Sequence, residues 1–351
     1  MELELAGVHH RYGDNQSLRG LDLRVAGGEV HAVMGPTGCG KTTALRLAGL
    51  LARPAAGEVR FDGRPVPAKG RARLGARRRT AMVHQEPALL RGTVRHNVAW
   101  GLRARGVRGA ELAARTDAAL ARLQLADLAH RNHDQLSGGE RKRTALAAAL
   151  AVQPEILLLD EPLSSTHPAL RQRLREHITA INRDLGVTIL VATHDIQDAL
   201  ALAGALTVMD QGVAVQAGPV DEVLHQPRCA FVAEFAGGAN LLRVDHSDGA
   251  VCRVGGLAIQ APAPLAPGSF LSIPPGHVLI GLTEPVTSAR NRFQGTITAM
   301  RPFDYGFLVT VACAGTPIAA VVTRGSVDEL GLVPGRDVWL YFKVSAVRSL
   351  G

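Results

Sequence analysis

The chain has 351 residues, a formal net charge of +8, and 46% hydrophobic and 20% charged residues. This composition excludes a disordered, collagen-like or coiled-coil chain, and the length suits two domains. The longest apolar runs, at 145–152 and 199–209, fall short of the roughly 18 to 20 residues that a membrane span needs. The N-terminus MELELAGVHH lacks the basic start and apolar core of a signal peptide. We therefore expect a cytoplasmic protein that does not itself cross a membrane.

Cysteine spacing and the distribution of basic residues argue against three kinds of site: a disulfide framework, a zinc site and a nucleic-acid site. The cysteines form no CxxC pair, so neither a disulfide framework nor a zinc site is indicated; they are Cys39, Cys229, Cys252 and Cys313. Basic residues concentrate in 60–79 without interleaved aromatic residues. We interpret that stretch as a solvated loop and expect no nucleic-acid partner.

The residue composition and the hydrophobic periodicity of the sequence change near residue 236. Before it, β-branched runs alternate with long Ala/Leu/Arg segments of helical period, which is typical of a parallel sheet covered by helices. After the residues FAGG at 235–238, short strands alternate with Pro and Gly clusters. The sequence predicts an α/β domain over 1–236 and a small β-domain over 237–351.

A glycine-rich phosphate loop is predicted after the first buried strand of the α/β domain. The strand candidate Glu29–Met34 runs into GPTGCGKTT and then into a helical segment. Glycines let backbone N–H groups surround a phosphate, Lys41 supplies a charge to the terminal phosphates of ATP, and Thr42 is suited to bind Mg²⁺. The alternative is a βα turn with an incidental lysine. The expected nucleotide-binding residues are Gly35, Pro36, Thr37, Gly38, Cys39, Gly40, Lys41, Thr42 and Thr43.

Two carboxylates end another apolar run, ILLLDEP. The functional residues of α/β sheets lie at the carboxyl ends of their strands. We therefore expect Asp160 to hold Mg²⁺ through a water molecule and Glu161 to polarise the water that attacks the γ-phosphate. The alternative is a pair of surface acids that cap a core strand.

The segment LSGGERKR at 136–143 resembles the signature sequence of ABC-type ATPases, with Glu140 at its last position. This resemblance covers about two thirds of the chain and implies a P-loop NTPase fold with a helical subdomain, here expected at 91–128. It also implies that the signature contacts nucleotide bound to a partner subunit, so that hydrolysis needs a homodimer. The residues concerned are Ser137, Gly138, Gly139 and Glu140. Ser137 is expected to cap the following helix as well.

The same resemblance assigns three further residues. Tyr12 matches the aromatic residue that stacks on adenine, although a Tyr packed in a hairpin is the alternative. Gln85 matches a glutamine that senses Mg²⁺ and the attacking water and couples the site to two membrane subunits. His194 matches a histidine that contacts the γ-phosphate, with a buried core histidine as the alternative.

The chain departs from the family pattern after ILLLDEPLS, where Ser165, Thr166 and His167 replace the usual Ala-Leu-Asp. The resemblance implies that this Asp crosses the dimer interface, so we expect slower or less cooperative hydrolysis. Cys39 lies at a predicted helix N-terminus, where a thiol pKa tends to fall. We accordingly expect alkylation of this thiol to block hydrolysis.

Three fragments of the C-terminal domain, TSARNRFQGTI, VVTRGSVDELGLVPG and WLYFKVSAV, resemble the oxyanion-binding modules of molybdate-binding proteins. This resemblance covers 286–350 and implies an OB-like barrel. The matching residues offer hydroxyl, amide, guanidinium and ammonium donors suited to a tetrahedral dianion such as molybdate or tungstate. They are Ser288, Arg290, Asn291, Ser326, Lys343 and Ser345. The alternative is that these side chains only make turn and subunit contacts.

The sequence thus predicts the ATP-hydrolysing subunit of a molybdate or tungstate importer, peripheral on the cytoplasmic face of the inner membrane. It would work with an external solute-binding protein, and the C-terminal domain would give feedback inhibition. Alternatives are import of sulfate, iron, polyamine or sugar, a non-transport ABC ATPase, and an oxyanion sensor with vestigial hydrolysis. Import, as opposed to export, follows from the resemblance alone.

Overall fold

A computed structural model describes residues 1–164, 166–235, 240–284, 286–303 and 306–350. These residues form two compact units, Met1–Val223 and Leu224–Gly351. The domain boundary predicted after Ala236 lies outside the described residues and stays a prediction. No helix in the described ranges is long and apolar enough to cross a membrane.

The centre of the first unit is a six-stranded sheet with the order β10-β9-β3-β8-β7-β6. Its strands are β3 (Val30–Met34), β6 (Thr80–Val83), β7 (Ile156–Asp160), β8 (Thr188–Ala192), β9 (Ala205–Asp210) and β10 (Val213–Pro219). All residues of β3, β7 and β8 are buried, as expected for parallel strands covered on both faces. In the parallel register, Asp160 pairs with Ala192 and Ala192 pairs with Val33. The carboxyl ends of these three strands therefore lie at one edge of the sheet.

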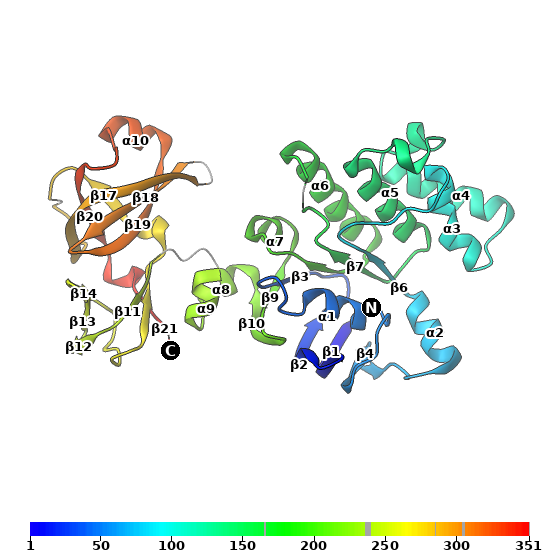
Figure 1. Ribbon diagram of the computed structural model, residues 1–351, viewed down its shortest axis with the longest axis horizontal. Helices are drawn as coiled ribbons and strands as arrows, with labels where there is room; N and C mark the ends of the chain where they lie inside the picture. Colours follow the sequence, from blue (N-terminus) through cyan, green and yellow to red (C-terminus); the bar gives the residue numbers. More distant parts are fainter. Residues whose placement is uncertain (165, 236–239, 285, 304–305, 351) are drawn as a thin grey trace. The chain divides into compact units, whose positions relative to one another are not determined.

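A second, antiparallel sheet has the order β2-β1-β4-β5. Its strands are β1 (Leu3–Tyr12), β2 (Asn15–Val25), β4 (Ala56–Phe61) and β5 (Arg64–Pro65). Helix α1 (Lys41–Ala48) lies beside this sheet (Figure 1) and buries Leu45 and Leu47 in a core that it shares with Leu5 of β1 and Leu158 of β7. The helix that starts at the phosphate loop is thus packed between the two sheets.

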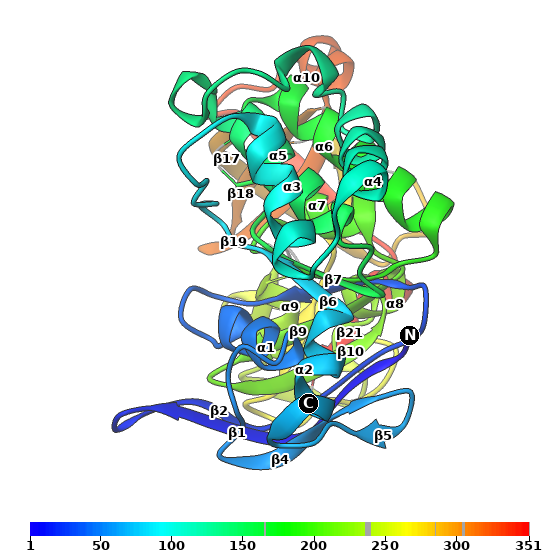
Figure 2. The same cartoon turned by 90° about the vertical axis from the view of Figure 1, so that its right-hand side faces the viewer.

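The remaining helices of the first unit include the predicted helical subdomain. They are α2 (Gly70–Arg78), α3 (Val94–Ala104), α4 (Gly109–Arg122), α5 (Gly138–Ala151), α6 (Pro168–Leu185) and α7 (Ile196–Leu202); α8 (Val220–His225) follows β10. Helices α3, α4 and α5 pack against one another (Figure 2). Short 3-10 helices lie at Ala126–Leu128 and His133–Gln135. The helical subdomain expected at 91–128 is confirmed.

The basic stretch at 60–79 is largely exposed as predicted, although Phe61 is buried. The loop prediction is wrong for Gly70–Arg78, which forms α2, and also for 60–61 and 64–65, which belong to β4 and β5. None of the residues of α2, all of which the structure describes, is buried. Ala, Leu and Arg are strong helix formers, so this segment needs little tertiary support. Arg73 connects α2 to the segment after α1 by donating hydrogen bonds to the backbone oxygens of Leu50 and Ala52, at 3.0 and 2.8 Å.

The second unit is the predicted small β-domain. Its largest sheet has five strands in the order β16-β20-β17-β18-β19, and two three-stranded sheets have the orders β11-β15-β21 and β12-β13-β14. The strands are β11 (Leu241–Arg243), β12 (His246–Asp248), β13 (Val251–Val254), β14 (Leu257–Gln260), β15 (Phe270–Ser272), β16 (Leu279–Gly281), β17 (Asn291–Phe303), β18 (Gly306–Cys313), β19 (Thr316–Thr323), β20 (Asp337–Phe342) and β21 (Arg348–Leu350). One apolar core that includes Ile297, Val309 and Leu340 joins them.

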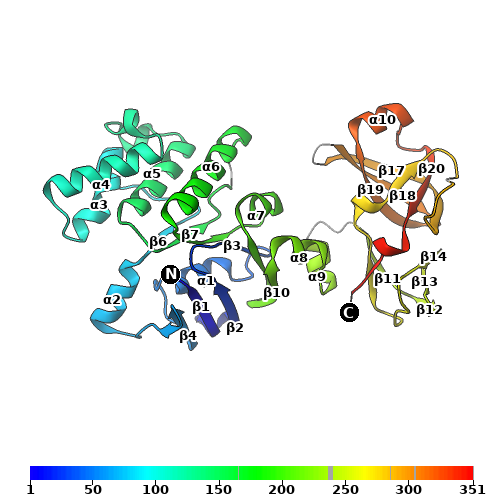
Figure 3. The ribbon, with the colours of Figure 1, turned by 180° about the vertical axis from the view of Figure 1, so that it is seen from behind.

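The helices of the second unit are short, in agreement with the sequence. They are α9 (Ala230–Phe235), α10 (Arg324–Leu330) and 3-10 turns at Pro275–His277 and Val344–Ala346. Helix α10 packs against the ends of β18 and β19 (Figure 3). The predicted fold class, a P-loop NTPase domain followed by a small OB-like β-domain, is confirmed.

Candidate nucleotide site

The phosphate loop connects the buried strand β3 to α1 in a few residues. Gly35 has φ +153°, and a Cβ atom there would lie 2.2 Å from the backbone oxygen of Met209. Only glycine therefore allows the loop to pass this close to β9. Gly40 is the N-cap residue of α1, in the left-handed conformation. The first N–H groups of α1 and the loop amides are available to an anion at this helix end.

Lys41 is buried at the start of α1. Its Nζ donates to the backbone oxygens of Gly35 and Pro36, at 2.7 and 3.1 Å. The ammonium group is thereby held inside the curve of the phosphate loop. A positive charge and a helix N-terminus converge on the same place, and both favour a phosphate group.

Two carboxylates follow β7 and make different contacts. Asp160 is buried, and its Oδ1 accepts a hydrogen bond from the Thr42 hydroxyl at 3.1 Å. Glu161 has φ +48°, which is unusual for a residue with a side chain, and its N–H donates to the backbone oxygen of Ala192 at 2.9 Å. The Glu161 side chain lines the same pocket as Asp160.

His194 follows β8 and contacts Glu161 directly. Its Nδ1 lies 2.8 Å from Glu161 Oε2. A histidine Nδ1–H can donate this hydrogen bond to the carboxylate, and the His194 side chain is 61% exposed. The Glu161 side chain is only 11% exposed. The histidine therefore orients a carboxylate that is largely shielded from solvent.

These side chains line one pocket of about 360 Å³. Its lining consists of Ser17, Thr37, Gly38, Gly40, Lys41, Thr42, Thr43, Gln85, Asp160, Glu161 and His194. The structure thus brings together the predicted phosphate loop, both carboxylates, the glutamine and the histidine. Sequence reasoning missed Ser17, whose Oγ lies 2.8 Å from Thr43 Oγ1. No pattern in the sequence marks Ser17, because only the packing of β2 beside α1 brings it to the loop.

The described residues that line this pocket include neither Tyr12 nor any of the predicted signature residues. Tyr12 is 49% exposed, and its ring meets His10 edge-on with ring centroids 4.7 Å apart. Its stacking on adenine stays a prediction. The contact of Ser137, Gly138 and Gly139 with a nucleotide on a partner also stays a prediction.

The signature segment begins α5 with a capping box, as expected for Ser137. The Ser137 hydroxyl accepts from the N–H of Glu140 at 3.3 Å, and Glu140 Oε2 accepts from the N–H of Ser137 at 2.8 Å. This bond from the Ser137 N–H lowers the pKa of the Glu140 carboxyl. Gly139 faces α6 so closely that a Cβ atom would lie 2.1 Å from Leu170 Cδ2. Glu140 thus completes the capping box of α5, and its predicted contact with nucleotide on a partner stays a prediction.

The expectation of a reactive thiol at Cys39 is wrong. Cys39 is buried in the core beneath the phosphate loop and is absent from the described pocket lining. Burial raises the pKa of the thiol, and the charge of Lys41 lowers it only in part. The helix N-terminus lowers a thiol pKa only where the sulfur faces solvent or an anion-binding position.

We expect Cys39 to resist alkylation in the native protein. Cys229 is partly exposed, whereas Cys39, Cys252 and Cys313 are buried, and burial raises the pKa of Cys313 to about 11. Limited iodoacetamide treatment followed by peptide mass spectrometry should label Cys229 first and the other three only after unfolding in urea. Equal labelling rates for Cys39 and Cys229 in the native protein would contradict this.

His167 is the N-cap residue of α6, and its side chain makes no capping hydrogen bond. Ser165, beside it in the segment that departs from the family pattern, lies outside the described residues. Pro168 occupies the first turn of the helix, and the first turn contains no acidic residue. The Leu170 N–H donates to the backbone oxygen of His167 at 3.0 Å, so what the N-terminus of α6 lacks is a side-chain oxygen that caps it.

We expect His167→Asp to raise the free energy of unfolding by about 0.5 to 2 kcal/mol, because Asp caps a helix and complements its dipole. Thermal unfolding of the two proteins measures this. The sequence also predicts that His167 makes hydrolysis by the wild-type protein less cooperative. If so, His167→Asp should have a higher Hill coefficient for ATP hydrolysis than the wild type. His167→Asn is the matched control, since Asn caps the helix without adding a charge. Unchanged stability in both variants would refute the capping argument.

The six residues expected to bind an oxyanion do not all converge. Asn291 is buried, and its amide bonds with the backbone N–H and oxygen of Gln260, at 2.7 and 3.0 Å. The Ser326 hydroxyl lies 2.9 Å from Thr323 Oγ1 at the start of α10. Lys343 and Ser345 line a common pocket of about 260 Å³, together with His277, Thr287 and Tyr341. Ser288 and Arg290 are exposed, and they flank Ala289, which also lines this pocket.

The fold and the pocket define a P-loop ATPase of the ABC type. The family model for ABC transporter matches residues 18–164, and the model for TOBE domain matches residues 287–348. A sulfate/thiosulfate import ATP-binding protein, CysA of Bradyrhizobium diazoefficiens, is 39% identical over 310 residues, which are 86% of this chain and 87% of that protein. An Fe(3+) ions import ATP-binding protein, FbpC of Escherichia coli K12, is 38% identical over 250 residues, which are 71% of each.

Two solved structures share the fold of the first unit. CbiO1 of Clostridium perfringens, part of an ABC transporter complex, has a TM-score of 0.60 at 28% identity over 64% of this chain and 90% of that chain. The cassette MJ0796, dimeric and bound to ADP and phosphate, has a TM-score of 0.57 at 28% identity over 62% of this chain and 98% of that chain. The chain belongs to the ATP-binding proteins of ABC importers and carries a TOBE domain. It is an ATPase whose hydrolysis of ATP is coupled to transport.

Proposed function

We propose that the chain is the energy-coupling ATPase of a sulfate or thiosulfate importer and that it works as a homodimer on a pair of membrane subunits. The observation that carries the ATPase part is the convergence of Lys41, Glu161 and His194 on one pocket. Strand ends of the parallel sheet supply the carboxylate and the histidine, and the loop after β3 supplies the phosphate site.

In this proposal Glu161 is the general base. Its carboxylate is shielded and held by His194 at 2.8 Å, so it is oriented to accept a proton from the attacking water. His194 and Lys41 line the same pocket. In this proposal the second ring nitrogen of His194 and the Lys41 ammonium contact the γ-phosphate of ATP. Gln85 lies in the pocket lining, where it positions the water and reports the state of the site to the membrane subunits.

The proposal includes Mg²⁺ bound with ATP. The residues fit this ion, because the Thr42 hydroxyl, the Asp160 carboxylate and the Gln85 amide are hard oxygen ligands in one pocket. Thr42 and Asp160 are already within 3.1 Å of each other. When bound, the ion neutralises phosphate charge as the γ-phosphate leaves.

The homodimer rests on two observations. The signature segment at the start of α5 contributes none of the described residues that line the pocket of its own chain. The similar cassette MJ0796 is dimeric in its solved structure. We propose that the signature of one chain completes the pocket of its partner. In this proposal the two ATPase chains bind peripherally at the cytoplasmic face of the membrane, and the membrane subunits dock near Gln85. An external solute-binding protein delivers the cargo.

Sulfate or thiosulfate replaces molybdate or tungstate as the leading cargo. The alignment with the sulfate/thiosulfate import protein spans 86% of this chain, whereas that with the iron import protein spans 71%. The longer alignment includes much of the C-terminal domain. Molybdate and tungstate remain second candidates because Lys343 and Ser345 share a pocket with three other polar side chains. A tetrahedral dianion of any of these kinds suits such donors, and feedback inhibition through this pocket stays a prediction.

The test is uptake of radiolabelled sulfate and molybdate by cells of the parent organism that carry Glu161→Gln in this chain. The proposal expects sulfate uptake to fall to the background level while molybdate uptake is unchanged. Loss of molybdate uptake alone would assign the second cargo. Normal uptake of both anions would refute an oxyanion importer, and uptake of labelled iron would then be measured.

A further inference from the structure

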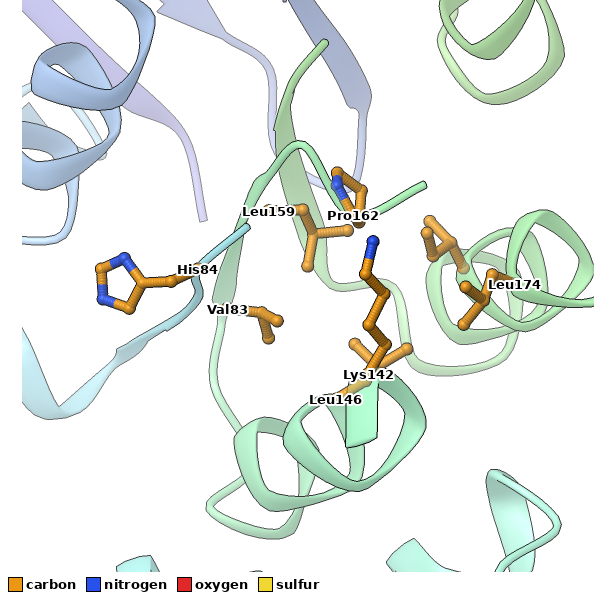
Figure 4. Close-up of a pocket in the computed structure, with 8 residues that line it drawn as sticks. Val83, His84, Lys142, Leu146, Leu159, Pro162 and Leu174 are labelled. Carbon is orange, nitrogen blue, oxygen red and sulfur yellow. The ribbon is translucent and has the colours of Figure 1, made fainter. Parts of the chain in front are cut away.

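Lys142 lies in an apolar slot between two strands and two helices of the first unit. The slot is lined by Val83 of β6, Leu159 of β7, Leu146 of α5 and Leu174 and Ile178 of α6, and Pro162 closes one end. Figure 4 shows the Lys142 chain rising through the slot from α5, with its nitrogen directed at the segment around Pro162; His84 points away. Lys142 is half-buried: its aliphatic stem lies against the apolar lining, and its ammonium group reaches the segment that follows Pro162.

The Lys142 ammonium is bound to the segment that follows the catalytic carboxylates. Its Nζ donates to the backbone oxygen of Ser164 at 2.5 Å. Ser164 in turn donates to the backbone oxygen of Glu161, from its N–H at 3.2 Å and from its hydroxyl at 2.8 Å. A chain of hydrogen bonds therefore runs from Lys142 through Ser164 to Glu161, the residue with strained backbone.

Partial burial of the Lys142 ammonium costs desolvation free energy unless a hydrogen bond compensates for it. Burial lowers the pKa of the Lys142 ammonium, and the carboxylates of Glu161, Asp198 and Glu86 oppose that shift. A Leu or Met side chain would fill an apolar slot without this desolvation cost. What only the charged end supplies is the strong hydrogen bond to Ser164.

Lys142 is also rigidly connected to the signature segment. Both lie on α5, whose N-cap is Ser137 and which continues without interruption to Ala151. A helix moves as a unit on this length scale, so a displacement of its first turn displaces the Lys142 side chain as well. The ammonium group then carries that displacement to the turn at 161–164.

We propose that Lys142 is a positioning residue that ties the turn at 161–164 to α5 and so couples the signature segment of each chain to its own Glu161. This inference rests on the proposed role of Glu161 as general base. It adds a route between the two nucleotide sites of a dimer: nucleotide that engages the signature of one chain sets the carboxylate of that same chain. The route uses backbone oxygens and does not need the Asp that His167 replaces.

The test compares Lys142→Met, Lys142→Gln and Lys69→Met with the wild-type protein. Met keeps the unbranched stem and loses the donor, and Gln keeps a donor. Lys69 is exposed before α2, so Lys69→Met is the same substitution without the contact. The measurements are kcat and Hill coefficient for ATP hydrolysis, Kd for ATP, and the midpoint of thermal unfolding.

For Lys142→Met we expect kcat to fall about tenfold, as for loss of one charge-assisted hydrogen bond. We also expect a Hill coefficient near that of independent sites, with Kd for ATP and the unfolding midpoint as in the wild type. Lys142→Gln should recover part of kcat and of the Hill coefficient, and Lys69→Met should behave as wild type. Unchanged kcat and Hill coefficient in Lys142→Met would overturn the inference.

If Lys142→Met is unstable, Lys142→Gln decides the question. A stable Lys142→Gln with near wild-type cooperativity supports the hydrogen bond, and a stable one with the full loss of cooperativity overturns it. Glu161→Gln separates this inference from the proposal on which it rests. Normal hydrolysis by Glu161→Gln would refute the general base, whereas loss of hydrolysis there with normal behaviour of both Lys142 variants would refute only the coupling role.

Discussion

Glu161→Gln is expected to lower kcat for ATP hydrolysis by a factor of about 100 to 10,000, the range that a general base contributes. The amide cannot accept a proton from water, but it has the size of the carboxylate and can still contact His194. The Kd for ATP should change by no more than about twofold, because Lys41 and the loop amides bind the phosphates. Steady-state hydrolysis and equilibrium binding of a fluorescent ATP analogue measure the two effects.

The matched control is Glu155→Gln, the same substitution just before the opposite end of β7. Glu155 is exposed and pairs with Arg79 at 2.6 Å, so its loss removes only a surface ion pair. Its kcat should stay within about twofold of wild type. The general-base role would be wrong if both variants hydrolysed ATP at similar rates.

Lys41→Ala is expected to weaken ATP binding by a factor of about 10 to 100, which corresponds to the loss of one hydrogen bond to a charged group. Hydrolysis should fall at least as far, because the ammonium also stabilises charge on the terminal phosphates. Isothermal titration with ATP and with ADP measures the change. ADP lacks the γ-phosphate and should lose less affinity than ATP.

A structural effect of this substitution must be separated from the loss of a phosphate contact. Lys41 Nζ donates to the oxygens of Gly35 and Pro36, so its removal also relaxes the phosphate loop. Lys41→Arg keeps the charge, but its larger planar group does not fit the same position. A phosphate-binding role predicts weak ATP binding in both variants with unfolding midpoints close to wild type. ATP binding by Lys41→Ala that equals wild type would contradict the assignment.

The coarse fold could be predicted from the sequence because its signals are local. The run ILLLD reads as a buried strand without any partner, and the spacing from Gly35 to Thr42 defines a loop and helix start on its own. The capping box at Ser137 and Glu140 is equally local. Each of these predictions depended on residues only a few positions apart.

The predictions for Cys39 and Asn291 were wrong because the environment of each side chain depends on residues that are distant in the sequence. Cys39 has the position of an activated thiol, but its side chain points into the core, where burial raises its pKa. The error at 60–79 has a local origin instead: positive charge indicates exposure but not a loop, and the Ala, Leu and Arg content of the segment supports the helix α2. Asn291 carries an amide suited to an anion, but that amide is hydrogen-bonded to the backbone of Gln260 at the end of β14.

The sequence by itself determined the fold class, the ABC-type nucleotide motifs and the separate C-terminal β-domain, because residue type and spacing are sufficient for each. Only the tertiary structure decided that Ser17 borders the phosphate loop, that His194 holds Glu161, and that Lys142 is bonded to Ser164. These contacts join residues 22 to 33 positions apart, so they follow from how strands and helices pack and not from any run of sequence. Packing also sets whether a polar side chain meets water, a core or another polar group, and this choice determines its chemistry.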